Sequence, residues 1–426
     1  MIKIIFNNRL IICISVVFHL LINIPGLAGL IGYGDDTSAF DLPFRTLASA
    51  LAANGDMPLW YPQHGDGFPQ LSLEFVTWTL NPMAALLGIV RPYDSLSLAA
   101  EIAIWRLIGF AGAYGFARLW GTVPLGAIAI ASTYIGSGTM ARASLAFATL
   151  IGQMLAPWIL VAASLAILAT SRARVFQAGA MLGLAASAMV WAGYAGTWIS
   201  APVISGPLLI SLALTKPRGL WRLLGASWIA LPIALLISSP VISETLSGTL
   251  TIEAATSRAR EVLMLVGHVR SLDLIGLLFV NPSYAMADGS ETLQPLYGGI
   301  LPPLILLTTL RFVPRLRFVI VIVLLLIFSL VFSNTINWSL YTHPIFGKYT
   351  FIYGIYNFDS YYVVLFFIAL LFSSMFFKTY IDISLIDKIF LYNFLLILCV
   401  ATIDKIALAS LNLLFLVTIR GPLILL

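Results

Sequence analysis

Apolar runs about as long as a bilayer is thick recur along this chain of 426 residues, and they restrict it to one class of fold. The sequence is 60% hydrophobic and only 10% charged. A soluble domain of that composition would have too little polar surface to face water. The runs are continuous and do not alternate, which is typical of membrane-spanning helices and not of barrel strands. The sequence therefore predicts an all-α, polytopic membrane protein.

We expect about 11–12 transmembrane helices, because the apolar runs define eleven spans and a stretch around Arg420 would add a twelfth. The first run follows Lys3 and Arg9 and is longer than the apolar core of a cleaved signal peptide. It is therefore expected to be an uncleaved signal-anchor with the N-terminus inside. The spans are predicted at 10–32, 96–117, 121–138, 150–170, 176–194, 197–214, 223–240, 295–311, 317–333, 361–377 and 389–409.

Lysines and arginines concentrate at the N-terminus and in alternate connections between these spans. Such a bias is expected of cytoplasmic loops, and it places 13 of the 23 basic residues inside. The net charge of +5 is thus explained by topology and does not indicate a nucleic-acid partner. The inside set comprises Lys3, Arg9, Arg118, Arg172, Arg174, Lys216, Arg218, Arg222, Arg311, Arg315, Arg317, Lys378 and Lys388.

The long connections fall on the outer side, at 33–95, 241–294 and 334–360, whereas the inner connections are short. No sizeable soluble domain or internal repeat is evident in the sequence. We therefore divide the chain into a membrane module at 1–240 that includes outer loop 33–95, a second outer loop at 241–294, and C-terminal transmembrane helices at 295–426.

Two segments of the first outer loop, 39–54 and 72–91, have helical patterns. Glu74, Asn81 and Pro82 are poorly suited to hydrocarbon, and a crossing at 72–91 would move the loop with Arg172 and Arg174 to the outside. We therefore predict that both segments lie along the membrane interface, with a full crossing by 72–91 as the alternative. The apolar face of the first segment is expected to contain Phe40, Leu42, Phe44, Leu47 and Leu51.

Two adjacent carboxylates, Asp35 and Asp36, follow the first span directly. A carboxylate near the headgroups, with its pKa raised by a partly apolar setting, can act as a general base on an acceptor hydroxyl. The alternative is that the pair caps the helix that follows, because aspartate is a favoured N-cap residue. The sequence leaves both roles open.

A turn rich in glycine and proline at 55–69 carries the other polar and aromatic residues of this loop. Its aromatic side chains can stack on a sugar ring, or they can anchor the loop at the membrane interface. We assign sugar or acceptor binding to Trp60, Tyr61, His64, Asp66 and Glu74. No metal ligands are assigned, although His64 beside Asp66 leaves a divalent metal as the alternative.

The second outer loop contains three arginines, Arg258, Arg260 and Arg270, that are candidates to hold a phosphate group. The planar guanidinium binds a phosphate through two hydrogen bonds and neutralises charge as a bond to that phosphate breaks. Arg258 and Arg260 are two residues apart, so on a helix they would not share a face. Contact with lipid headgroups is the alternative role.

Two charged residues, Glu101 and Arg106, fall inside the predicted span 96–117. Either a buried pair or an opening to a polar cavity would make them compatible with the membrane. The sequence has no phosphate-binding loop, dinucleotide fingerprint or nucleophile elbow, which argues against an ATP-driven pump.

The order of motifs in the first outer loop resembles the bacterial YfhO-like proteins of the GT-C glycosyltransferase superfamily. The residues that carry the resemblance are Gly34-Asp35-Asp36, Leu42-Pro43-Phe44, Gly55-Asp56-Met57-Pro58-Leu59-Trp60-Tyr61-Pro62, Gly65-Asp66-Gly67-Phe68-Pro69 and Asn81-Pro82, with Asn281-Pro282 and Tyr297-Gly298-Gly299 further on. The resemblance implies a GT-C-like fold with interfacial helices in the first outer loop, a polyprenyl-phosphate sugar donor and inversion at the sugar. It also implies that Asp36 or Asp35 is catalytic. Tyr61 departs from the family, where asparagine is common.

These observations favour a glycosyltransferase of a bacterial inner membrane, embedded in the lipid bilayer with its N-terminus cytoplasmic and its active site periplasmic. It is expected to move a sugar from a polyprenyl-phosphate donor to a glycan or lipid-linked acceptor, without a cofactor. A transporter or glycolipid flippase is the alternative, although such proteins usually contain paired repeats that are not evident here. A non-catalytic assembly partner is a third interpretation.

Overall fold

The computed structural model describes residues 42–55, 60–61, 68–69, 82–122, 124–136, 147–192 and 216–249, together with positions 13, 17, 205–206, 209–210 and 212–214. Over these residues the regular secondary structure is helical except for one antiparallel pair of two-residue strands, β1 (Trp60–Tyr61) and β2 (Phe68–Pro69). The helices are α3 (Leu42–Ala53), α5 (Pro82–Val90), α6 (Ser95–Leu119), α7 (Pro124–Gly136), α9 (Phe147–Ile167), α10 (Arg172–Trp191) and α12 (Gly219–Thr249).

Four helices in the described part of the chain are long and apolar enough to cross a membrane: Ser95–Leu119, Leu150–Ile167, Arg172–Trp191 and Gly219–Ser243. They coincide with the predicted spans 96–117, 150–170, 176–194 and 223–240, so the prediction of a helical membrane protein is confirmed. The total of 11–12 crossings stays a prediction, because 10–32 is described only at positions 13 and 17 and every span after 250 lies outside the described residues.

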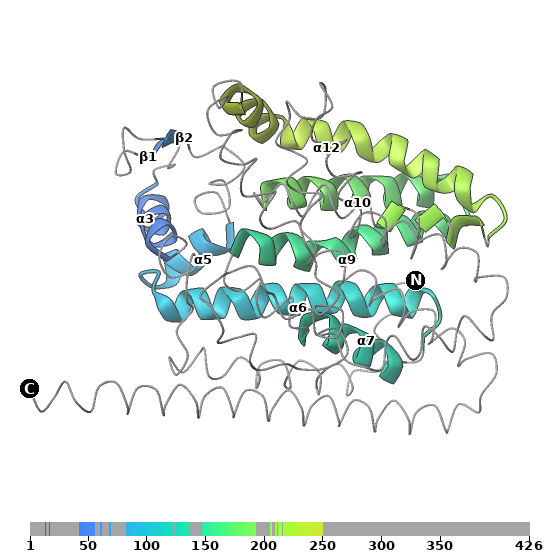
Figure 1. The fold of residues 1–426 in the computed structure, drawn as a ribbon, viewed down its shortest axis with the longest axis horizontal. Coiled ribbons are helices and arrows are strands. Elements are labelled where there is room, and N and C mark those ends of the chain that lie inside the picture. Colours follow the sequence, from blue (N-terminus) through green and yellow to red (C-terminus); the bar gives the residue numbers. More distant parts are fainter. Residues whose placement is uncertain are drawn as a thin grey trace, which may run out of the picture.

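The four long helices stand in the order α6, α9, α10 and α12 (Figure 1). α6 also packs against α7, and α3 and α5 lie at the end where α6 begins (Figure 1). α7, the predicted span 121–138, is described over 13 residues, or about 20 Å at 1.5 Å per residue. The predicted span 197–214 is described only in short helical pieces, of which Leu209, Leu212 and Ala213 belong to the main core.

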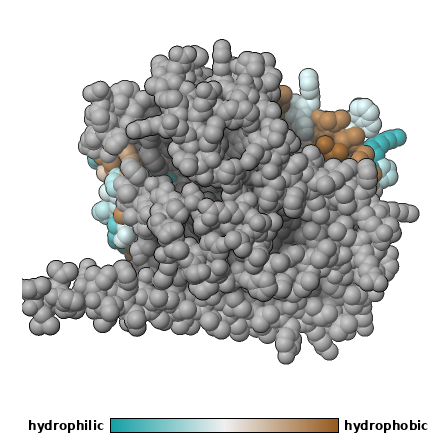
Figure 2. Space-filling view, in the orientation of Figure 1, coloured by the Kyte–Doolittle hydropathy of each residue, from teal (hydrophilic) through white to brown (hydrophobic). Residues whose placement is uncertain are grey.

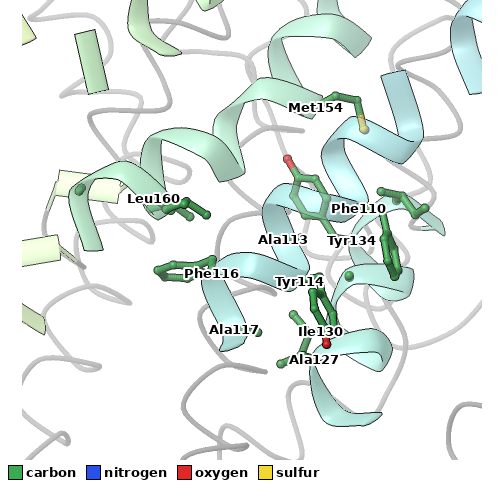
Figure 3. Packing of buried hydrophobic residues seen from close by; sticks show 14 of the residues in the cluster. Phe110, Ala113, Tyr114, Phe116, Ala117, Ala127, Ile130, Tyr134, Met154 and Leu160 are labelled. Carbon is green, nitrogen blue, oxygen red and sulfur yellow. The ribbon is translucent and has the colours of Figure 1, made fainter. Parts of the chain in front are cut away.

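The core lies between α6, α7 and α9, and small residues on α6 allow the other helices to come close. Figure 3 shows Phe110, Tyr114 and Phe116 of α6 among residues from α7 and α9 such as Tyr134 and Met154. A Cβ added at Gly112 would lie 2.9 Å from Nε1 of Trp158, whose indole donates a hydrogen bond to the carbonyl of Ile108 at 3.0 Å. The α6–α9 contact therefore depends on glycine at this face.

The contact between α10 and α12 also depends on glycine residues. Gly179 and Gly183, one turn apart on α10, face Ala226 and Ala230 of α12. A Cβ at Gly179 would lie 2.8 Å from the Ala226 carbonyl oxygen, and one at Gly183 would lie 2.9 Å from the Ala230 carbonyl oxygen. Since apolar side chains gain little by leaving lipid for another helix, such close backbone packing is a main source of helix association in a membrane.

The opposite face of α12 is apolar and exposed. Hydrophobic side chains appear at the upper right of Figure 2, the side of the molecule where Figure 1 places α12. On a soluble protein a stripe of this size would promote aggregation, but on a membrane-spanning helix it is the face suited to acyl chains. The stripe consists of Trp221, Leu224, Trp228, Leu231 and Leu235, all at least half exposed.

Basic residues from three predicted inside loops meet at one end of the helix row. Arg118 ends α6, Arg172 and Arg174 begin α10, and Lys216, Arg218 and Arg222 surround the start of α12. Contacts confirm that these ends are neighbours. Arg222 Nη1 donates to the carbonyl of Ile167 at 3.5 Å, and Lys216 Nζ lies 6.0 Å from the centre of the Trp120 ring. The predicted topology requires these loops to share a side.

The two predicted interfacial helices of the first outer loop correspond to α3 and α5, which pack against each other at the opposite end. α3 agrees closely with the predicted 39–54. α5 begins at Pro82, and 72–81 lies outside the described residues, so the part of the 72–91 prediction that is described is a helix of nine residues. Neither α3 nor α5 is among the four helices suited to crossing a membrane.

The Gly183→Val substitution is expected to destabilise the protein by about 1–3 kcal/mol, because the branched side chain would force α10 and α12 apart. Thermal unfolding in detergent measures this. Met181→Val introduces the same residue at an exposed position of the same helix and serves as the control. Equal melting temperatures for the two variants would contradict the packing argument.

The orientation of the helix row can be tested with single cysteines in a Cys13→Ser, Cys399→Ser background. Asn54→Cys follows α3 and Ala173→Cys lies in the basic end, and both positions are exposed. A membrane-impermeant maleimide is expected to label Asn54→Cys in intact cells and Ala173→Cys only after permeabilisation, since basic loops stay cytoplasmic. The reverse pattern would show that the predicted topology is wrong.

Candidate functional site

The described residues include two of the predicted site residues, Trp60 and Tyr61, which form β1. Trp60 pairs with Pro69 and Tyr61 with Phe68 in the antiparallel register. The strand pair thus closes the turn predicted at 55–69 by holding its two sides together. The other assigned residues lie outside the described part of the chain: Asp35, Asp36, His64, Asp66, Glu74, Arg258, Arg260 and Arg270.

A buried polar cluster joins the first outer loop to the start of α6. One guanidinium nitrogen of Arg45, Nη1, lies 2.7 Å from both carboxylate oxygens of Glu101. Both side chains are completely buried. The hydroxyl of Tyr93 donates to Glu101 Oε2 at 2.6 Å, and the indole of Trp105 donates to Oε1 at 3.3 Å. We refer to Arg45, Tyr93, Glu101 and Trp105 as the Arg45–Glu101 cluster.

The turn before α6 contributes Tyr93 to the cluster and fixes where the helix begins. Asp94 is the N-cap of α6, and its carboxylate accepts a hydrogen bond from the backbone N–H of Ser97 at 2.9 Å. That hydrogen bond lowers the pKa of Asp94 below its ordinary value, and Arg91, which pairs with Asp94, adds to the effect. The capped start fixes Tyr93 just outside the helix and Glu101 about 9 Å along it.

α3 contributes Arg45 to the cluster from the other side. The residues it buries are Phe44, Arg45, Ala48 and Ser49, which recur one turn apart and form one face. This differs from the predicted apolar face, since Leu42, Leu47 and Leu51 are only partly buried. The prediction omitted Arg45 because it considered apolar residues alone, and a single arginine within an apolar helix was the signal that it overlooked.

Two further contacts hold α3 in place. The hydroxyl of Thr46 donates to the backbone carbonyl of Tyr93 at 3.1 Å. α3 also crosses α5 so closely at Ser49 that a Cβ on Gly88 would overlap the Ser49 side chain. α3 is therefore fixed by an ion pair, a hydrogen bond and a steric contact at three successive points along its length.

The ion pair found at Glu101 differs from the one the sequence suggested. Glu101 and Arg106 were expected to form a buried pair or to open on a polar cavity, but the ion pair of Glu101 is with Arg45, which is 56 residues away. The reason is geometric, because five residues along an α-helix place two side chains about 140° apart around its axis. A partner from another helix reaches Glu101 more directly.

The charged groups of this cluster are buried together with their partners. Removing a carboxylate and a guanidinium from water costs several kcal/mol each, and the pair is tolerated because every charge has a close partner. Burial also raises the pKa of Tyr93 well above its ordinary value, so the hydroxyl stays protonated and donates to Glu101. Because its oxygens already accept hydrogen bonds from three side chains, Glu101 is suited to holding α3 and not to taking a proton from a substrate.

Within the described residues, no group of three or more histidines, cysteines, aspartates or glutamates is arranged to hold a metal ion. His64 and Asp66, the pair for which a metal was the alternative, lie outside those residues.

Removing one member of the buried ion pair is expected to cost about 3–5 kcal/mol of stability, because the remaining charge is left buried without its partner. Arg45→Ala and Glu101→Ala should each show this in thermal unfolding, and the double variant should lose less than the sum of the two. Arg91→Ala breaks the exposed pair with Asp94 and is the control, with an expected loss below about 1 kcal/mol. Additive losses at Arg45 and Glu101 would contradict the coupling.

Comparison with known proteins gave no match to this chain among protein-family models, curated proteins or solved structures.

Proposed function

We propose that this protein is a membrane glycosyltransferase of the GT-C type. It takes a sugar from a polyprenyl-phosphate carrier at the outer face of a bacterial inner membrane and transfers it to a glycan or lipid-linked acceptor. Asp36 or Asp35 serves as the general base, and one or more of Arg258, Arg260 and Arg270 holds the phosphate of the donor. Trp60, Tyr61, His64, Asp66 and Glu74 shape the sugar and acceptor site.

The reaction requires one proton transfer and one displacement. The aspartate removes the proton from an acceptor hydroxyl while that oxygen attacks the anomeric carbon. The bond between the anomeric carbon and the phosphate oxygen breaks, and its electron pair leaves with the polyprenyl phosphate. An arginine beside the phosphate stabilises the charge that develops on it. Attack from the face opposite the leaving group inverts the configuration of the sugar, and the phosphate needs no proton to leave.

The observation that carries this proposal is the rigid attachment of α3 to α6 by the Arg45–Glu101 cluster. Only five residues separate Asp36 from Leu42, the first residue of α3. A covalent chain of that length spans at most about 22 Å, so a fixed α3 limits the region within which the aspartates can lie. A polar loop tied to the end of a membrane helix row suits chemistry on a headgroup, whereas a transporter needs its polar groups along a path through the membrane.

The Asp36→Asn and Asp35→Asn variants test this function. At least one of them is expected to lower the turnover rate by about 10²–10⁴-fold, the range typical of a lost general base, with unchanged protein yield in the membrane. Transfer is measured in vesicles that contain the purified protein and a panel of polyprenyl-phosphate hexoses with radiolabelled sugar.

Asp94→Asn is the matched control, because it makes the same chemical change at an aspartate of the same loop, and asparagine caps a helix nearly as well as aspartate. It should transfer sugar at the wild-type rate. Full transfer by both Asp35→Asn and Asp36→Asn would eliminate the proposed base. Movement of labelled glycolipid across the vesicle membrane without transfer would favour a flippase instead.

A further inference from the structure

Polar side chains connect α3 to α6 and to the turn before it. α3 packs against α5, and α5 in turn contacts α6. The side chain of Arg45 extends beyond this contact to Glu101, and Thr46 adds a hydrogen bond to Tyr93. The link between the first outer loop and the helix row therefore includes a few directed interactions beside the apolar contacts of Leu42, Phe44 and Ala48.

Directed interactions of this kind specify one position for a helix. Apolar contact through Phe44 and Ala48 is not directional and would tolerate a small rotation or shift of α3. The ion pair would not, because a shift of one turn would leave two buried charges apart. Tyr93 and Trp105 hold the Glu101 carboxylate from the α6 side, so the group that receives Arg45 is itself fixed.

Stability alone does not explain the ion pair. Buried ion pairs are often no more stabilising than apolar residues of the same volume, and their best-supported use is to specify register. α3 is the element that follows Asp35 and Asp36 in the chain. A general base must sit within hydrogen-bond reach of the hydroxyl it deprotonates, and a displacement of about 1 Å can cost about a hundredfold in rate.

We propose that Arg45, Tyr93 and Glu101 are positioning residues that fix the register of α3, and that sugar transfer depends on this register. This inference rests on the proposed function for its catalytic consequence, although the fixed register of α3 can be tested without it. The three residues act through the loop and do not touch substrate.

The test replaces the cluster with apolar residues of similar volume in the variant Arg45→Met/Tyr93→Phe/Glu101→Leu. Because no charge is left buried, the protein is expected to fold with wild-type yield and elute as the wild type does. Amide hydrogen exchange across Leu42–Ala53 is expected to be at least about tenfold faster. The kcat for sugar transfer is expected to fall at least about tenfold with little change in KM for the donor, because the base is misplaced while the donor site is intact.

Trp120→Phe/Ser164→Ala is the matched control. It removes a buried hydrogen bond of 2.9 Å at the other end of α6 and should leave both the exchange of α3 and kcat unchanged. Wild-type exchange of α3 in the triple variant would overturn the register role. Faster exchange with an unchanged kcat would overturn the positioning role. If the wild-type protein transfers no sugar, the proposed function fails, and the exchange comparison alone decides whether these residues fix α3.

Tyr93→Phe provides the second variant in case the triple variant does not fold. It removes one hydroxyl and leaves the ion pair and the Thr46 hydrogen bond to the backbone in place. A smaller increase in α3 exchange and a smaller fall in kcat are expected, again with KM unchanged. Wild-type exchange and kcat in a folded Tyr93→Phe protein would overturn the proposal.

Discussion

The ion pair between Arg45 and Glu101 is the contact on which the α3 and α5 end of this protein depends. It joins a short helix, which has too little apolar length to cross a membrane, to a long helix that has enough. Such a pair is costly to bury, and separating its partners leaves that cost uncompensated. The geometry of Tyr93, Trp105 and the N-cap Asp94 follows from that requirement, because Tyr93 and Trp105 donate hydrogen bonds to Glu101 and Asp94 fixes the start of the helix that carries it.

The interior of the helix row is built on a different physical basis. Glycines on α6 and α10 remove the side chains that would separate neighbouring helices, so α9 and α12 approach at backbone distance. In a membrane, where apolar burial adds little to helix association, this close packing replaces the hydrophobic core of a soluble protein. The end that contains α3 and α5 is thus held by an ion pair, and the helix row by close packing at glycines.

The sequence predicted the long helices well because the length of an apolar run reports directly on a membrane crossing. α6, α9, α10 and α12 all lie where the runs placed them. Helix ends were less accurate, since they depend on local chemistry such as the Asp94 cap. Pro82 in the first position of α5 is the kind of signal that marks a start, and the prediction of a helix over 72–91 did not use it.

The candidate site was much harder to predict. Arg45 and Glu101 are 56 residues apart, and no periodicity within either helix indicates that they meet. The glycines of α10 were visible as small residues one turn apart, but their partners on α12 were not, because a single sequence does not show which helices are neighbours. The roles assigned to Asp35, Asp36 and the arginines of the second outer loop stay predictions, since those residues lie outside the described part of the chain.

Arginines at the basic end of the helix row also bind backbone carbonyl groups. Arg222 donates to a carbonyl of the last residue of α9, and Arg118 donates to the carbonyl of Thr122 just past the end of α6. Carbonyl groups at helix C-termini lack partners within the helix and carry partial negative charge, so cations there are favourable. The arginines on which the predicted topology depends therefore also bind backbone carbonyl groups, Arg222 at the end of α9 and Arg118 in the turn after α6. A change that neutralised them would remove these contacts together with the charge on which the predicted topology rests, which limits how freely this side of the molecule can vary.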